Sequence, residues 1–137
     1  MGRSSFTDSE RRFVELARVA RLATVSPDGT PHAVPICPAL DGDRILVATE
    51  AGSAKTRNID SDPRAAVVFD DYVEDWATLR RVLVQGTARI HGSGPVWDLG
   101  KRLLEEKFPQ YEPIAPIRAH ETVMLEVDVR RVSSEGF

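Results

Sequence analysis

The sequence has a single cysteine, Cys37, among its 137 residues. A lone cysteine excludes an internal disulfide, and this suits a reducing compartment. No apolar run approaches the roughly 20 residues that a membrane helix needs. The first residues, MGRSSFTDSERRF, also lack the apolar region of a secretory signal. We therefore expect a cytoplasmic protein with no membrane partner.

Strong charge of one sign is missing too. The formal net charge is −3 at pH 7, which gives no global attraction to nucleic acid. Three scattered histidines and one cysteine form no cluster with the spacing of a metal site. The G-x-G-x-x-G, Walker-lysine and G-x-S-x-G motifs are also absent. We expect no nucleic-acid partner, no metal and no dedicated nucleophile of a known local motif.

The composition present is that of a folded protein. It is 42% hydrophobic and 28% charged, and the length suits one domain over residues 1–137. Thr7 and Glu10 have the spacing of a capping box, which predicts an N-terminal helix within residues 1–20. A second helix is predicted at about 94–108, with Pro95 in its first turn and Pro109 just past its end.

Strand patterns dominate the rest of the sequence. Short apolar segments joined by tight turns predict about six strands in an antiparallel sheet that closes into a small barrel; they lie at 21–26, 31–40, 44–50, 64–70, 81–91 and 122–132. Three prolines within 31–40 predict an edge strand, because proline cannot donate to a sheet ladder. The last segment alternates, with Leu125 and Val127 on one face and Glu126 and Asp128 on the other. This alternation predicts a half-buried strand.

One short predicted helix, within GSAKTRNIDSDP, carries its charges in the unfavourable order. Lys55 and Arg57 lie near its start and Asp60 and Asp62 near its end, against the helix dipole by a few tenths of a kcal/mol per charge. With Ser53 as the N-cap, the first turn offers free N–H groups, so a bound phosphate would explain the cations. Solvated surface charges explain them equally well.

Two further segments have both functional and structural readings. Trp76 lies in a polar stretch, where an indole can stack on a flat ligand or fill a subunit interface. Gln85 and Gly86 interrupt an apolar strand, which suits either a ligand that approaches the backbone or an ordinary barrel bend.

The segments RLATVSPDGTPHAVPI, ILVAT, KTRNIDSDPRAAVVFD and VQGTARI resemble the pyridoxamine-5′-phosphate-oxidase-like split β-barrel family. DYVEDWATLRRVLVQGTARI is similar to the actinobacterial branch that uses coenzyme F420, a deazaflavin. The resemblance implies a mainly β (α+β) fold, a six-stranded antiparallel split β-barrel with a few peripheral helices. It also implies a homodimer with cofactor sites at the subunit interface.

The resemblance assigns the cofactor-binding residues. Lys55 and Arg57 would bind the cofactor phosphate. The other implied contacts are Ser53, Thr56 and Asn58 around the phosphate, Val34 and Pro35 near the ring, Gln85 on its strand, and Trp76 near the ring, from the same or the partner subunit. Oxidases of pyridoxamine phosphate carry an Arg- and Trp-rich segment after the barrel, where this sequence reads RRVSSEGF. We therefore do not expect that activity.

The function expected on this basis is an F420H2-dependent reductase that transfers a hydride to a small unsaturated or electron-poor substrate. The cofactor supplies the chemistry, and the protein supplies position and water exclusion. Tyr72, Asp75 and His32 are proton-donor candidates by residue type alone, and solvent can serve instead. Two alternatives remain open: an FMN-binding oxidase or flavin reductase of the same fold, and a non-catalytic flavin- or deazaflavin-binding protein.

Overall fold

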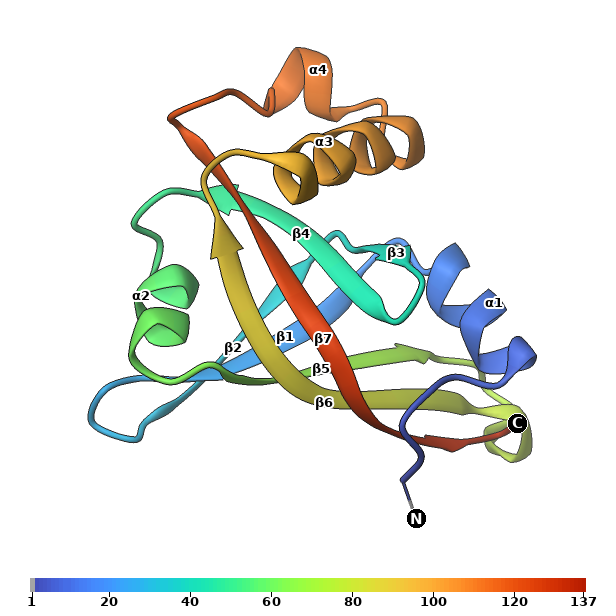
Figure 1. The fold of residues 1–137 in the computed structure, drawn as a ribbon. Coiled ribbons are helices and arrows are strands. Elements are labelled where there is room, and N and C mark those ends of the chain that lie inside the picture. Colours follow the sequence, from blue (N-terminus) through green and yellow to red (C-terminus); the bar gives the residue numbers. More distant parts are fainter. Residues whose placement is uncertain (1) are drawn as a thin grey trace.

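In a computed structural model, which describes residues 2–137, seven strands form one antiparallel sheet in the order β2-β1-β5-β6-β7-β4-β3 (Figure 1). The strands are β1 (Ala20–Val25), β2 (Pro31–Ile36), β3 (Ala39–Asp41), β4 (Arg44–Glu50), β5 (Arg64–Asp71), β6 (Arg80–His91) and β7 (Thr122–Glu135). The mainly β, antiparallel architecture with peripheral helices confirms the predicted fold class. The predicted count of six strands was one too few.

The additional strand arises because the predicted strand at 31–40 breaks at Cys37 and Pro38. β2 pairs only with β1, and β3 pairs only with β4. The two halves of the proline-rich segment therefore lie at opposite edges of the sheet. This confirms the predicted edge position, where a missing N–H donor does least harm to the ladder.

The sheet curls around one apolar core. Six of the seven strands contribute fully buried side chains to it, among them Leu22, Ile36, Ile45, Val67, Val84 and Val127. Two helices pack against this core, α1 (Asp8–Leu16) through Val14 and α2 (Ala54–Ser61) through Ile59. α1 ends before the predicted limit of residue 20, since Ala20 already belongs to β1.

The N-terminus of α1 has the predicted capping box. The Thr7 hydroxyl accepts a hydrogen bond from the Glu10 amide, and the Glu10 carboxylate accepts one from the Thr7 amide. Burial alone would raise the pKa of Glu10, but hydrogen bonds from Arg3, Ser134 and Thr7 lower it to about 2. This carboxylate therefore ties the helix start to the N-terminal segment and to β7.

The helix α3 (Pro95–Lys107) lies over the outer face of β4 and β7, and α4 (Tyr111–Ile114) lies beyond it, next to α3 (Figure 1). Leu46, Trp97, Leu104 and Met124 form a second apolar cluster there. The prediction that β7 is half-buried was wrong, because α3 covers Met124 on its outer face and Glu126 on the same face is only 3% exposed. No helix among residues 2–137 combines the length and the apolar character needed to cross a bilayer.

Candidate functional site

A cleft of about 800 Å³ opens between the end of β4, the start of α2 and the segment that leads from α4 into β7. Ser53 and Lys55 line it from α2, and Ala48, Thr49 and Glu50 line it from β4. The cleft is large enough for part of a cofactor-sized ligand, since ligand pockets typically enclose about 300–1,000 Å³.

The N-terminus of α2 presents backbone donors without a capping side chain. Ser53 is the N-cap, in extended conformation, but its hydroxyl makes no capping hydrogen bond. The first-turn amides of Ala54, Lys55 and Thr56 therefore have no side-chain acceptor at this end of the helix. The contrast with the completed capping box of α1 is clear. Uncapped first-turn amides and the positive end of the helix dipole together favour an anion.

Both cations of α2 lie at this positive end. Lys55 is half-buried, lines the cleft and forms no ion pair within residues 2–137. Arg57 is exposed and folds back, so that its Nη1 donates to the carbonyl of Gly52 at 2.5 Å. Near the other end, Arg64 pairs with Asp62 at 2.6 Å and lowers the pKa of that carboxyl to about 2, while Asp60 is exposed. Among residues 2–137, no carboxylate pairs with Lys55 at the cationic end.

Thr56 and Asn58, predicted to surround the phosphate, are buried beneath the helix. The Thr56 hydroxyl donates to the carbonyl of Ser53 at 2.7 Å. The Asn58 amide donates to the hydroxyl of Thr24 on β1 at 3.0 Å. Thr56 thus fixes the first turn of α2, Asn58 holds the helix against β1, and neither is among the residues that line the cleft.

Of the predicted β2 residues, His32 and Val34 face the interior and Pro35 faces outward. Val34 packs against the main core. His32 lies opposite Thr24 in the β1–β2 register, and its Nδ1 is buried without a hydrogen-bond partner. None of the three lines the cleft at the start of α2.

Trp76, Tyr72 and Asp75 lie in the connection between β5 and β6, which contains the short helix η1 (Trp76–Thr78). The indole N–H of Trp76 donates to the Tyr72 hydroxyl at 3.2 Å, and both side chains are more than 60% exposed. β5 begins close to the end of α2 and runs away from it (Figure 1). At about 3.3 Å per residue, the strand separates this connection from α2 by roughly 25 Å. One subunit therefore does not bring Trp76 and Lys55 together.

Gln85 and Gly86 mark an irregularity between β6 and β7. The register of the two strands shifts between these residues, and Gln85 is exposed opposite Ala66 on β5. A Cβ at Gly86 would lie 1.9 Å from the backbone oxygen of Asp128. The close packing of β6 and β7 thus requires a glycine here. This favours the interpretation of Gly86 as an ordinary bend in the barrel.

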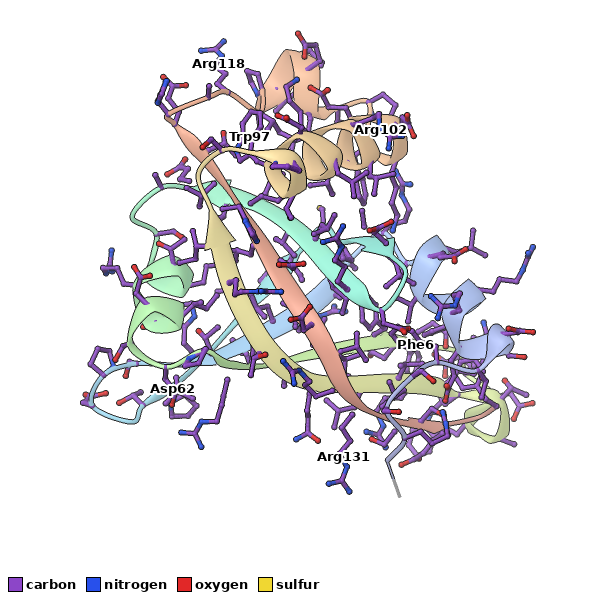
Figure 2. All side chains as sticks on the ribbon, in the orientation of Figure 1. Phe6, Asp62, Trp97, Arg102, Arg118 and Arg131 are labelled. Carbon is purple, nitrogen blue, oxygen red and sulfur yellow. The ribbon has the colours of Figure 1, made fainter. Side chains whose placement is uncertain are left out.

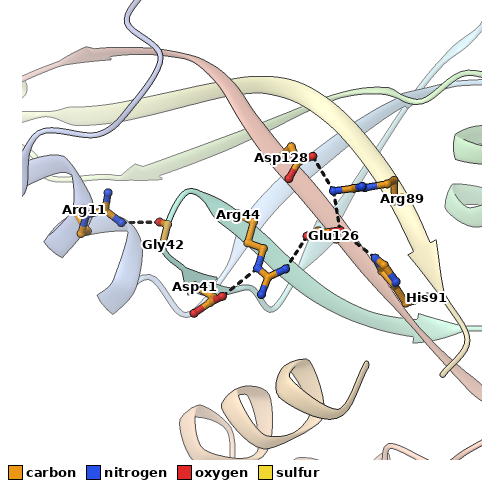
Figure 3. Close-up of polar contacts among 8 residues, drawn as sticks. All are labelled: Arg11, Asp41, Gly42, Arg44, Arg89, His91, Glu126 and Asp128. Carbon is orange, nitrogen blue, oxygen red and sulfur yellow. Dashed lines mark hydrogen bonds and ion pairs between the residues drawn. The ribbon is translucent and has the colours of Figure 1, made fainter. Parts of the chain in front are cut away.

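A polar cluster that the sequence did not reveal surrounds the buried side chain of Glu126 (Figure 3). Arg44 donates to its carboxylate at 2.8 Å, and His91 lies 2.9 Å and Arg89 3.2 Å from it. Burial would raise the pKa of Glu126, but Arg44, His91 and Arg89 lower it. These residues come from three neighbouring strands, so only the sheet register brings them together. The cluster fastens β4, β6 and β7, and it lies outside the cleft.

The far wall of the cleft contains residues that sequence reasoning did not select. Arg118 and His120, from the segment between α4 and β7, line it together with Tyr111 of α4. Burial raises the pKa of Tyr111 to about 12, so its phenol stays protonated. Figure 2 shows Arg118 at the outer end of this segment. No local motif marks these residues, since their position depends on how α3 and α4 pack against the sheet. Among residues 2–137, no three His, Cys, Asp or Glu side chains form a metal-binding group.

The family model for pyridoxamine 5′-phosphate oxidase matches residues 6–135. The chain belongs to the pyridoxamine 5′-phosphate oxidase family. This confirms the resemblance found in the sequence.

Curated relatives of this pyridoxamine 5′-phosphate oxidase family member include a 5a,11a-dehydrotetracycline/5a,11a-dehydrooxytetracycline reductase from Streptomyces rimosus. The two are 34% identical over 94 residues, which cover 65% of this chain and 66% of the reductase. A pyridoxine/pyridoxamine 5′-phosphate oxidase from Azorhizobium caulinodans is 38% identical over 81 residues, which cover 58% of this chain and 36% of the oxidase. The matches thus span about two thirds of the reductase and little more than a third of the oxidase.

Solved structures share the fold. A conserved hypothetical protein from Mycobacterium tuberculosis superimposes with a TM-score of 0.81 at 27% identity, over 94% of this chain and 84% of that one. A heme binding protein from Mycobacterium smegmatis has a TM-score of 0.78 at 20% identity, over 92% of this chain and 52% of that one. The second likeness concerns the fold alone.

Proposed function

We propose that this protein is a coenzyme F420-dependent reductase that transfers a hydride from the reduced deazaflavin to a small unsaturated or electron-poor substrate. The observation that carries the proposal is the uncapped N-terminus of α2, with Lys55 in the cleft and no ion pair to that amine within residues 2–137. The relationship to the Streptomyces tetracycline reductase supports a reductive activity. The resemblance to the actinobacterial branch supports the deazaflavin.

The residues of the cleft fit a cofactor that carries a phosphate. The first-turn amides of α2 would donate to the phosphate oxygens, and Lys55 would add a charge-assisted hydrogen bond. Arg57 would have to turn from Gly52 to reach the same group, which an exposed arginine does at little cost. When bound, the deazaflavin supplies the hydride. The residues of this chain then bind and orient the two reactants and keep water from the reacting atoms.

The proton that completes the reduction needs a donor near the cleft. Tyr72 and Asp75 lie at the far end of β5, so they would serve only from a second subunit. His32 faces the interior, where its Nδ1 is buried. Solvent is therefore the simplest proton source for a site built by one subunit, and the two hairpin residues are the candidates in a dimer.

In a homodimer, Trp76 of one subunit would reach the cleft that contains Lys55 of the other subunit. Five small or apolar side chains face outward from the adjoining strands β2, β1, β5 and β6, on the side opposite the core; they are Ala33, Ala23, Ala66, Val68 and Leu83. Such a face suits an interface with a second copy, whose β5–β6 hairpin would then reach the cofactor. Sedimentation of the purified protein tests this, and a monomer at micromolar concentration would count against the trans arrangement.

The central experiment is a fluorescence titration of the purified protein with F420 and, separately, with FMN. The Lys55→Ala and Arg57→Ala variants are compared with Lys101→Ala, a surface lysine of α3 paired with Glu105. Loss of one charged hydrogen bond predicts about 10- to 100-fold weaker binding. Tight F420 binding, weakened at Lys55 and Arg57 but unchanged at Lys101, would support the proposal and justify a screen of F420H2-dependent reductions.

Other outcomes separate the alternatives. Preferential binding of FMN would move the function to flavin chemistry, as in the pyridoxine/pyridoxamine 5′-phosphate oxidases among the relatives. Tight F420 binding without turnover on any acceptor would indicate a non-catalytic binding protein. Binding of neither cofactor, or equal binding by Lys55→Ala, would refute the phosphate site.

A further inference from the structure

The cleft continues beyond Lys55 to a second wall that carries a permanent cation, Arg118. Arg118 and His120 lie on that wall, across the cleft from α2. The other charged groups that line the cleft are Glu50, from β4, and Glu121, next to His120. Arg118 is only loosely paired, since its Nη1 lies 3.9 Å from the Glu121 carboxylate and its side chain is 64% exposed. Its guanidinium therefore keeps most of its capacity to bind another anion.

The segment that carries Arg118 and His120 is held firmly in place. Arg118 and Thr122 close it through two hydrogen bonds, of 2.9 and 3.1 Å. The Ala51 amide donates to the Glu121 carbonyl at 3.0 Å, which links the segment to the start of α2. The indole of Trp97 on α3 donates to the Thr122 carbonyl at 3.0 Å, and Figure 2 shows this indole between α3 and the sheet. Lys55 and the backbone that carries Arg118 therefore keep a fixed spacing, which favours a ligand with an anionic group for each of them.

His120 has an unfavourable backbone conformation. Its φ is 71°, and it is the one non-glycine residue with a positive φ within residues 2–137. Glycine adopts this conformation without steric cost, whereas a side chain is disfavoured there. Backbone strain of this kind is concentrated at binding and catalytic sites, where the function of the side chain compensates for its conformational energy.

We propose that Arg118 and His120 form a second anionic subsite, which binds a carboxylate or second phosphate of the same ligand whose phosphate Lys55 binds. The inference rests on the proposed function and refines it. F420 carries glutamate carboxylates beyond its phosphate, whereas FMN carries a single phosphate group. The second wall therefore selects a ligand with more than one anionic group.

The test measures the dissociation constants of F420 and FMN for Arg118→Gln and for a matched control, Arg130→Gln. Arg130 is 66% exposed and lies 3.9 Å from Asp128, so it resembles Arg118 in exposure and pairing but lies outside the cleft. Loss of an exposed charged contact predicts roughly fivefold to twentyfold weaker F420 binding for Arg118→Gln. FMN binding should change less than about twofold, and the control should change neither ligand.

A second variant, His120→Gly, separates binding from folding. Because glycine suits the backbone at this position, its midpoint of thermal unfolding should stay equal to that of the wild type or rise. Its affinity for F420 should nevertheless fall severalfold. Equal losses for F420 and FMN, or no loss in either variant, would overturn the second subsite. If the wild type bound neither F420 nor FMN, or if Lys55→Ala bound F420 as tightly as the wild type, the proposed function itself would be refuted.

Discussion

Gly86→Ala tests the closest approach between β6 and β7. A methyl carbon at residue 86 would lie 1.9 Å from the Asp128 carbonyl oxygen, whereas ordinary contact begins near 3.4 Å. The strands would have to separate by about 1.5 Å at the point where their register already shifts. Such a displacement breaks neighbouring ladder hydrogen bonds, because N–H···O bonds weaken beyond about 3.2 Å.

The expected cost combines two effects. One or two lost hydrogen bonds cost about 1 kcal/mol each, and residual overpacking adds about 1–3 kcal/mol. We therefore expect a loss of roughly 2–5 kcal/mol in the free energy of unfolding. For a chain of this length, each kcal/mol corresponds to about 3–4 °C in the midpoint of thermal unfolding. The midpoint should fall by roughly 6–20 °C.

Urea and thermal unfolding, followed by circular dichroism, measure this loss. Gly92→Ala is the control, since a Cβ at Gly92 meets no atom within 4 Å and its φ is not left-handed. It should change stability by less than about 0.5 kcal/mol. If Gly86→Ala were as stable as Gly92→Ala, the packing argument would be wrong. If it were stable but bound cofactor poorly, the glycine would instead allow the ligand to approach the backbone.

Three further predictions concern buried polar groups. Glu10→Gln should weaken the dependence of the free energy of unfolding on pH at acid pH. The pKa of Glu10 in the folded protein, about 2, lies below its ordinary value of 4.5. The carboxylate therefore stabilises the fold above about pH 4.5, and this stabilisation is lost as the pH falls toward 2. Urea unfolding between pH 2 and 7 measures the change, and an unaltered curve would contradict it. Asn58→Ala should lower the free energy of unfolding by about 1–3 kcal/mol, because the buried Thr24 hydroxyl loses its hydrogen bond with Asn58. A variant that is as stable as the wild type but binds cofactor more weakly would instead place Asn58 at the phosphate. Glu126→Gln should lower the free energy of unfolding by about 1–3 kcal/mol, because Arg44 loses its ion pair with a buried carboxylate. Cofactor affinity should not change, because Glu126 and its partners lie outside the cleft.

The sequence predicted those features that local chemistry determines. The capping box at Thr7, the edge position of the proline-rich strand and the helix after Pro95 all depend on a few adjacent residues, and the structure confirms each. The reversed order of charges along α2 could likewise be identified in the sequence. The structure shows that Arg64 pairs with Asp62 near one end, while the first turn at the other end has no side-chain cap.

Features that depend on long-range packing could not be read in the same way. The burial of Glu126 requires three strands to align so that Arg44, Arg89 and His91 surround one carboxylate, and this alignment leaves no local pattern. The same holds for Arg118 and His120, which reach the cleft only through the packing of α3 and α4. The inward orientation of Asn58 depends on a contact with Thr24, 34 residues earlier in the chain.

The place of β7 in the ladder has a consequence for synthesis on the ribosome. Of the seven strands described, β7 is the last to be made, yet it lies between β6 and β4 and pairs with both. Until it emerges, the β3–β4 hairpin has no partner on one side, and β6 has an open edge. Nascent chains therefore expose two apolar strand edges, which invite wrong pairing between neighbouring chains. Premature termination before Thr122 would leave this exposure permanent, so truncated products should be cleared by quality control or aggregate.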